Sequence, residues 1–237
     1  MKNILKVVLL LLLPYVSFSQ QKNLGTWNMV NTKINLGKKW SVFGELQLRT
    51  QLFYDNPYYY EVKGGASYAI NKNFSFLLGV GKYLTYADDG DFKGPLVSNE
   101  TRNWQQLTIS HYLERIKFEH RYRVEQRWIS TGYRNRFRYR LNMDIPLHNK
   151  KLEPKTFYLS AFNEIFLTNR EPFFQRNRVF GGVGYKVNKN IVILSGVLHQ
   201  FDYQPGKKTN KNFLQLNCFI ELNLKHVSGD KIPVSID

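Results

Sequence analysis

The sequence has a single cysteine, Cys218, among its 237 residues. No internal disulfide can form, which excludes the small secreted domains that depend on disulfides for stability. Long apolar runs are also scarce. Beyond the N-terminal region no stretch approaches the ~20 apolar residues that a transmembrane helix requires, and the mean hydropathy is −0.42. These two absences exclude a disulfide scaffold and a helical membrane protein.

The first residues have the features of a cleaved export signal. Two lysines accompany the apolar run Val7–Leu13, and the small residues of Ser17-Phe18-Ser19 follow it. We therefore expect residues 1–19 to be a signal peptide, too short in its apolar part to span a bilayer. Because no linker or low-complexity tract divides the remainder, residues 20–237 are predicted to form one exported domain.

Acidic residues are in short supply, since 34 lysines and arginines face 18 aspartates and glutamates. Such an excess would indicate nucleic-acid binding inside a cell, but the export signal argues against that partner. We expect the basic side chains to meet outer-membrane lipid and lipopolysaccharide, small anionic solutes, or carboxylates of the protein itself. The 15 tyrosines and 17 phenylalanines are typical of the aromatic girdles of outer-membrane barrels.

A period of two residues dominates the rest of the sequence. Every second residue from Lys117 to Arg127 is charged, whereas the residues between them are mostly apolar or aromatic. Tyr133–Ile145 and Leu214–Leu224 alternate in the same way. A helix would scatter these charges around its circumference, but a strand places them on one face. The pattern therefore predicts long β-strands with one polar face and one apolar face.

The same period recurs often enough to predict an all-β protein: a transmembrane, antiparallel, up-and-down β-barrel of ten to twelve strands. Most segments exceed the ~9–11 residues that a tilted membrane strand requires. Thr26–Leu36 is a further candidate, which either threads the lumen or needs a partner strand, for example in Val227–Ile236. The other segments are Trp40–Leu52, Tyr58–Ile70, Phe74–Tyr86, Glu100–Leu113, Thr156–Thr168, Phe174–Val187 and Ile191–Tyr203.

The connections are expected to alternate between tight polar turns and longer links, as they do in outer-membrane barrels, where the longer ones face outward. Leu147–Lys155 departs from this scheme, because it is long but falls on the side of the tight turns. The longer links are predicted at Phe53–Pro57, Ala87–Asn99, Ile129–Gly132, Asn169–Pro172 and Gln204–Asn210.

The charged face of each strand is predicted to point into the barrel, because a charge facing lipid at the midplane costs about 2–4 kcal/mol. Arginine outnumbers lysine there, and its planar fork binds carboxylate or phosphate bidentately. The predicted basic residues of the lumen are Arg49, Arg102, Arg121, Arg123, Arg127, Arg134, Arg136, Arg138, Arg140, Arg176 and Arg178, and Lys63 shares their face. The predicted acidic partners are Glu45, Glu61, Glu100, Glu119, Glu125, Glu164 and Glu221.

The connection Ile129–Gly132 predicts the register of the two strands that it joins. One inward pair is complementary and two are like-charged, so the like-charged arginines need counter-charges from elsewhere. Glu164 on the next strand, and Glu45 or Glu221 across the lumen, are the candidates. The predicted pairs are Glu125 with Arg136, Arg123 with Arg138, and Arg121 with Arg140.

Two functional interpretations of this face remain open. Basic side chains along a lumen can conduct anions, so our prediction is a narrow pore that passes small anionic solutes. The alternative is a closed structural or surface-interaction barrel, because arginine–glutamate pairs can fill a barrel this narrow. A lipid-modifying barrel enzyme is a distant third.

Catalysis is not expected, because the pattern assembles no nucleophile, base and orienting group. His226 and Ser228 have the spacing of some outer-membrane lipid hydrolases but follow the last clear strand, and His111 is predicted to face outward beside the inward Ser110. No histidine or cysteine spacing indicates a metal site, and no cofactor is expected. The acidic segment Asp88–Asp91 is interpreted as a solvated outer loop.

Several short motifs resemble a family of bacterial outer-membrane proteins known as domain of unknown function 2490. The resemblance implies a β-barrel in the outer membrane and brings no established activity. The lumen arginines also invite an architectural analogy with oligosaccharide porins, which supports no inference about substrate. The motifs are Trp27, Glu45-Leu46-Gln47-Leu48-Arg49, Glu100-x-Arg102-x-Trp104-Gln105-Gln106, Arg121-x-Arg123-x-Glu125-Gln126-Arg127, Arg136-x-Arg138-x-Arg140, Asn163-Glu164-x-Phe166 and Asn177-Arg178.

Overall fold

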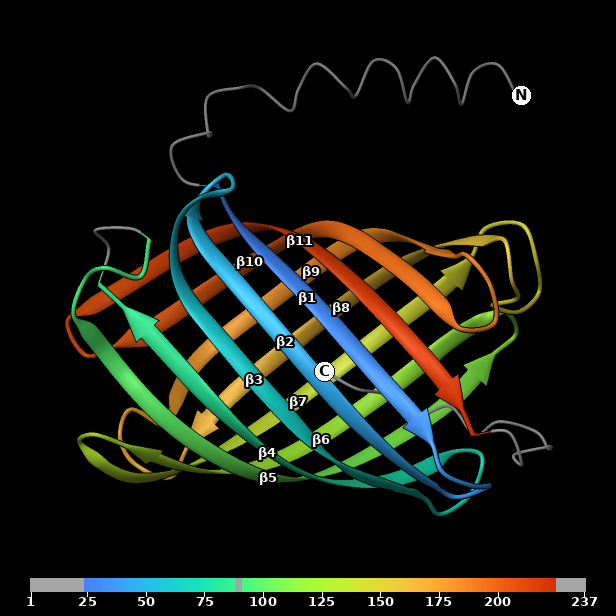
Figure 1. Ribbon diagram of the computed structural model, residues 1–237, viewed down its shortest axis with the longest axis horizontal. Helices are drawn as coiled ribbons and strands as arrows, with labels where there is room; N and C mark the ends of the chain where they lie inside the picture. The colour runs from blue at the N-terminus through green and yellow to red at the C-terminus, as the bar shows by residue number, and fades with distance from the viewer. Residues whose placement is uncertain (1–23, 88–90, 225–237) are drawn as a thin grey trace.

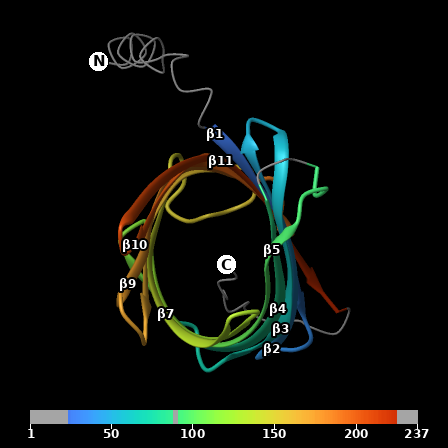
Figure 2. The same ribbon diagram turned by 90° about the vertical axis from the view of Figure 1, so that its left-hand side faces the viewer.

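The computed structural model describes residues 24–87 and 91–224. Within these residues eleven strands form one closed barrel, seen from the side in Figure 1 and along its axis in Figure 2. The described part of the chain contains no helix long and apolar enough to cross a bilayer. An all-β barrel of ten to twelve strands, as predicted from the alternation, is confirmed.

The strands match most of the predicted segments. The strand bounds are β1 Leu24–Asn35, β2 Trp40–Leu52, β3 Asp55–Ala69, β4 Phe74–Tyr86, β5 Leu96–Leu113, β6 Ile116–Ile129, β7 Gly132–Pro146, β8 Thr156–Thr168, β9 Phe174–Lys186, β10 Ile191–Gln204 and β11 Lys207–Asn223.

The barrel closes through a parallel pair, which corrects the prediction of a purely antiparallel sheet. β1 lies in the wall between β2 and β11, not in the lumen, and runs parallel to β11 from Leu24 opposite Asn212 to Asn35 opposite Asn223. All other neighbours are antiparallel hairpins. The cause is the odd count: in an up-and-down sheet of eleven strands the first and last run in the same direction. Val227–Ile236 lies outside the described residues.

The two ends of the barrel differ less than predicted. We call the end where β1 meets β2 the turn end and the end where β2 meets β3 the loop end. At the loop end only residues 53–54, 130–131 and 205–206 separate successive strands in three of the connections. Several predicted links were therefore wrong, because β3, β5 and β11 continue into them. Segments such as Lys207–Asn210 are polar on both faces, so no alternation marks them as strand.

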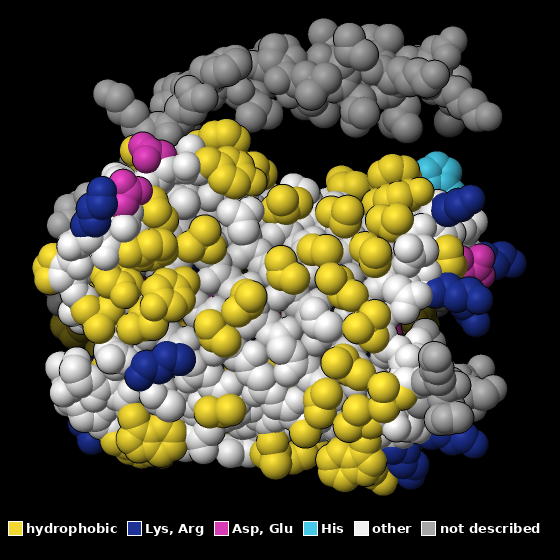
Figure 3. All heavy atoms as spheres, in the orientation of Figure 1, with side chains coloured by type: hydrophobic (Ala, Val, Ile, Leu, Met, Phe, Trp, Pro, Cys, Tyr) yellow, Lys and Arg dark blue, Asp and Glu magenta, His cyan; other side chains and the backbone are white. Residues whose placement is uncertain are grey.

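The pleat separates an outer surface from an enclosed interior. Apolar side chains such as Leu46, Val62 and Leu78 are exposed on the outside, and Figure 3 shows hydrophobic side chains spread over one face with most charged ones toward its ends. Inward positions are buried and are both polar and aromatic: Glu45 and Glu125 are buried there, and so is the ring of Trp104. The interior is therefore the place where the charged residues of the sequence collect.

Candidate functional site

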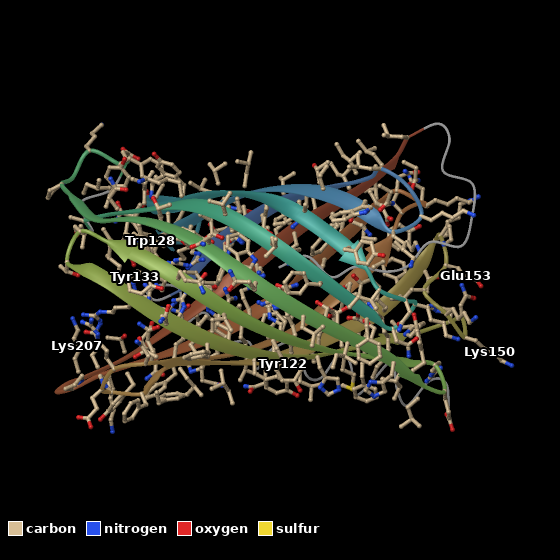
Figure 4. The ribbon with its side chains drawn as sticks, turned by 90° about the horizontal axis from the view of Figure 1, so that it is seen from below. Tyr122, Trp128, Tyr133, Lys150, Glu153 and Lys207 are labelled. Atoms are coloured by element: carbon tan, nitrogen blue, oxygen red, sulfur yellow. The ribbon has the colours of Figure 1, made fainter. Side chains whose placement is uncertain are left out.

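A cavity of about 650 Å³ runs inside the barrel. Thr85 and Gln204 line it close to the loop end, and Lys117 and Val192 line it close to the turn end. In Figure 4 the loop end carries the label of Lys207, and the turn end carries Lys150 and Glu153. The cavity therefore has wall residues near both ends of the barrel.

Glu164 on β8 is the centre of the arginine network. Its Oε1 accepts hydrogen bonds from Nη2 of Arg121 and from Nη2 of Arg138, both at 2.7 Å. Its Oε2 accepts one from Nη2 of Arg140 at 2.9 Å, and Nη1 of Arg178 lies 3.8 Å away. Since the Glu164 side chain is 0% exposed, this one enclosed carboxylate is the shared counter-charge of four arginines.

Glu125 on β6 is the second anchor. Arg136 donates to its Oε2 through Nε at 2.7 Å, and Arg138 donates to its Oε1 through Nη1 at 2.6 Å. The β6–β7 register agrees with the prediction, because Glu125 lies opposite Arg136 and the two like-charged pairs lie where expected. Arg138 bridges Glu125 and Glu164, so the two anchors form one network. We call Arg121, Arg123, Arg136, Arg138, Arg140 and Arg178, with Glu125 and Glu164, the arginine belt.

Of the three carboxylates suggested as counter-charges for the like-charged arginines, Glu164 binds three of them. Glu45 pairs with Lys63, its direct neighbour across the β2–β3 ladder. Glu221 lies 3.6 Å from Nζ of Lys33, its neighbour across the β1–β11 seam. Adjacent strands bring side chains closer than opposite walls do, so each glutamate pairs with the nearest lysine.

Further pairs surround the belt. Near the loop end Glu100 accepts hydrogen bonds from Arg102 at 2.6 Å and from Nη2 of Arg127 at 3.0 Å. Arg176 pairs with Asp202 on the neighbouring strand β10. On β2 and β3 the carboxylate of Glu61 lies 2.8 Å from Lys63 and 3.5 Å from Arg49. Near the turn end Glu119 accepts from Nζ of Lys117 at 3.1 Å.

One predicted lumen residue is not enclosed. Arg134 is exposed, two residues after β7 begins at the loop end. It alternates in phase with the inward residues of β7 and lies opposite Arg127, but so close to the end of the strand the barrel wall does not enclose it. Alternation along a strand therefore predicts which face a residue lies on, but not how far it lies from the end of the barrel.

Aromatic rings support the guanidinium groups, a feature that the sequence interpretation missed because it assigned aromatics to the outer girdles. The Arg49 guanidinium lies 3.5 Å from the ring centroid of Trp27, and that of Arg102 lies 3.6 Å from the centroid of Tyr83. Such stacking contributes about 0.5–2 kcal/mol. Alternation along the strand could have predicted this position. Tyr83 is opposite Glu61 in the β3–β4 ladder, so both side chains lie on the inward face.

A second group of interior residues is apolar. The buried cluster comprises one tryptophan, one tyrosine and several aliphatic and phenylalanine side chains from β1 and β8–β11. The ring of Tyr158 lies against Gly184, where an added Cβ would come within 2.1 Å of it. Glycine lets this ring lie against the wall. We call this cluster the apolar wall: Trp27, Tyr158, Phe162, Phe180, Leu194, Leu198 and Phe213.

The long connection of residues 147–155 lies at the turn end of the barrel, where one of its side chains contacts the interior. Leu152 packs against the apolar wall, and Nζ of Lys186 donates to its carbonyl oxygen at 3.0 Å. Nδ2 of Asn149 donates to Oγ1 of Thr156 at 2.7 Å. Seen along the axis in Figure 2, this yellow segment crosses the opening of the ring of strands, and Figure 1 shows it beyond the strand ends. The connection therefore narrows the turn end on the side of the apolar wall.

The remaining candidates do not form a second site. His111 is exposed on the outer face while Ser110 is buried on the inner one, so the two do not point toward each other. Nδ1 of His120 is 2.9 Å from the hydroxyl of Tyr139. No group of three or more metal-ligating side chains occurs among residues 24–87 and 91–224. Residues 226, 228 and 88–90 lie outside the described residues.

The comparisons with known proteins identify a family and no closer relative. No curated protein and no solved structure matches the chain. The model of one family, described as protein of unknown function (DUF2490), matches residues 24–211, which covers the arginine belt and most of the apolar wall. The chain belongs to this DUF2490 family.

Proposed function

We propose that this protein is an outer-membrane barrel whose lumen passes small anionic solutes. The observation that supports passage is the charge of the cavity wall. Among the described residues eight arginines and two lysines line the cavity, against three glutamates and two aspartates. Rings of basic side chains favour anions in narrow pores. Since the wall includes residues near both ends of the barrel, the cations extend along its length.

The position of the carboxylates strengthens this proposal. Glu125 and Glu164 are buried behind the arginines and do not line the cavity, whereas Arg136, Arg138 and Arg140 do. The carboxylates therefore hold the guanidinium groups in place without masking their side toward the cavity. A planar guanidinium has five N–H donors, so it can bind one carboxylate from behind and an anionic solute in front.

The outer surface supports placement in a membrane. Aromatic pairs flank both ends of the apolar band: Trp40 and Tyr68 near the turn end, with ring centroids 4.9 Å apart, and Trp128 and Tyr133 near the loop end, at 5.5 Å. Figure 4 shows Trp128 and Tyr133 on the wall close to that end. Outward amide side chains within the band form hydrogen bonds with each other. Nε2 of Gln126 donates to Oε1 of Gln105 at 3.0 Å, and Nε2 of Gln105 donates to Oε1 of Gln126 at 3.2 Å. Paired amides lower the cost of facing lipid.

A closed structural barrel is the second candidate, and the ion pairs favour it. The side chains of Arg121 and Glu164 are 1% and 0% exposed, so this part of the interior is filled. The cavity of about 650 Å³ is the feature that favours passage over closure. We propose no catalytic role for any residue of the chain.

Single-channel recording of the refolded full chain in planar bilayers tests the proposal. We expect discrete steps with a higher permeability for chloride than for potassium. Arg140→Gln removes one cavity-lining charge and leaves Glu164 bound to Arg121 and Arg138. A unit charge at ~7 Å in a water-like medium changes the permeability of each ion about threefold, in opposite directions for chloride and potassium, so the ratio should fall about sevenfold. Lys82→Gln is the matched control, because Lys82 is exposed on the outer face.

The control should keep the selectivity of the unmodified protein. Folding of each variant is checked by its heat-dependent migration in detergent gels. Absence of any conductance from the folded protein would overturn passage and leave the closed barrel.

A further inference from the structure

Polar side chains form a row across five neighbouring strands of the cavity wall. Arg140 on β7 lies opposite Glu164 on β8, which lies opposite Arg178 on β9. Gln200 on β10 and Lys211 on β11 continue the row. All except Glu164 line the cavity. This row therefore presents three cations and an amide to the cavity and no carboxylate.

The next inward row, one pleat toward the turn end, is apolar on four of the same five strands. Phe162 on β8 lies opposite Phe180 on β9, which lies opposite Leu198 on β10 and then Phe213 on β11. The rings of Phe162 and Phe180 are stacked with centroids 5.0 Å apart. Leu194, further toward the turn end, belongs to the same cluster and also lines the cavity. Of this row Phe162 and Leu198 line the cavity, so the lining is apolar on β8 and β10 directly beside the cationic row.

Arg140 marks the boundary between the two rows. Its guanidinium lies 4.2 Å from the ring centroid of Phe162, and its Nη2 donates to Glu164. Its side chain is 15% exposed, whereas the other three arginines around Glu164 are 6% exposed or less. Arg140 is therefore the cation of this group that an entering solute meets most directly, beside an aromatic ring.

We propose that the cavity selects amphipathic anions: solutes with one carboxylate or phosphate head and an aliphatic tail. The head binds the cationic row at Arg140 and Arg178, and the tail lies along Phe162, Leu198 and Leu194 toward the turn end. The volume of about 650 Å³ falls within the ~300–1,000 Å³ of small-molecule sites. This inference rests on the proposed function and narrows the class of solute.

Titration calorimetry with straight-chain carboxylates measures the preference directly. The refolded full chain in detergent is titrated with acetate, butanoate, hexanoate and octanoate, and the heats from empty micelles are subtracted. Affinity should rise about two- to fourfold for each methylene that leaves water for the apolar row. Octyl phosphate should bind as octanoate does, whereas octylamine, with the same tail and a cationic head, should not bind.

Two variants and one control separate the two rows. Leu194→Ala should weaken octanoate about tenfold and leave acetate unchanged, because only the longer tail reaches that side chain. Arg140→Gln should weaken all members of the series by a similar factor. Ile193→Ala is the matched control: Ile193 is the adjacent residue of β10 and is exposed on the outer face, so the series should match that of the unmodified protein.

The outcomes distinguish this inference from the function on which it rests. A flat series together with anion-selective conductance overturns the amphipathic preference and leaves the pore. A rising series in a folded protein that does not conduct overturns passage and retains the cavity preference. A series that rises equally in Leu194→Ala shows that the tail binds elsewhere, and overturns the inference.

Discussion

The arginine belt on β6–β9 and the apolar wall on β1 and β8–β11 both lie on the inward face of the barrel and share β8 and β9, yet different interactions hold them together. In the belt Glu164 is enclosed by four arginines within 3.8 Å. One pleat away the rings of Phe162 and Phe180 stack on each other, with centroids 5.0 Å apart. Burying a charge is costly unless it is paired, whereas burying a ring is favourable by itself. The stability of the belt therefore depends on every charged side chain keeping its partner, whereas the stability of the apolar wall depends on its side chains filling the available volume.

The largest effect should follow removal of the central carboxylate. Glu164→Gln keeps the shape of the side chain and leaves Arg121, Arg138 and Arg140 without their shared counter-charge, which should lower the free energy of unfolding by about 3–5 kcal/mol. Urea titration of the refolded protein measures this. Glu153→Gln, in the exposed connection at the turn end, is the control and should change stability by less than about 0.5 kcal/mol. Equal stability of the two variants would show that the belt tolerates an unpaired cation.

A cavity in the apolar wall should cost somewhat less. Leu198 is 1% exposed within the cluster, and Leu198→Ala should lower the free energy of unfolding by about 2–4 kcal/mol. The neighbouring Val197 points outward and is 54% exposed, so Val197→Ala should cost about 1 kcal/mol or less. Similar values for the two variants would mean that the interior and the outer surface are equally well packed.

The smallest effect should come from the glycine beneath Tyr158. A Cβ at position 184 would come within 2.1 Å of that ring, whereas one at Gly181 meets no atom within 4 Å. Gly184→Ala should therefore cost about 1–3 kcal/mol through displacement of the ring. Gly181→Ala should leave the unfolding midpoint nearly unchanged. A stable Gly184→Ala variant would show that the ring of Tyr158 moves freely into the cavity.

Alternation predicted the arginine belt well and the apolar wall poorly. β2, β4 and β8 begin and end at the predicted residues, because mostly apolar side chains recur at every second position along each of them. The β6–β7 register could be predicted because only residues 130–131 connect the two strands, and so short a connection fixes which residues lie opposite each other.

Aromatic residues carry no such information about their face. Trp27 and Tyr83 are buried inside, whereas Trp128 and Tyr133 are exposed outside, and residue type alone does not separate these pairs. The position of β1 in the wall could not be predicted from the sequence either. Its parallel neighbour β11 is about 190 residues away in the chain, and such a distant pairing produces no local sequence pattern. The pairing of Glu45 with a lysine needed the positions of adjacent strands, not only their faces.

The parallel seam between β1 and β11 has a consequence for assembly. It joins Leu24 to Asn212, nearly the full span of the described chain, so its closure carries the greatest entropic cost of any contact in the sheet. Parallel ladders are also slightly weaker per residue than antiparallel ones. We therefore expect the β1–β11 pair to form last when the protein folds and to separate first under mechanical force. It is the site at which the closed sheet would open.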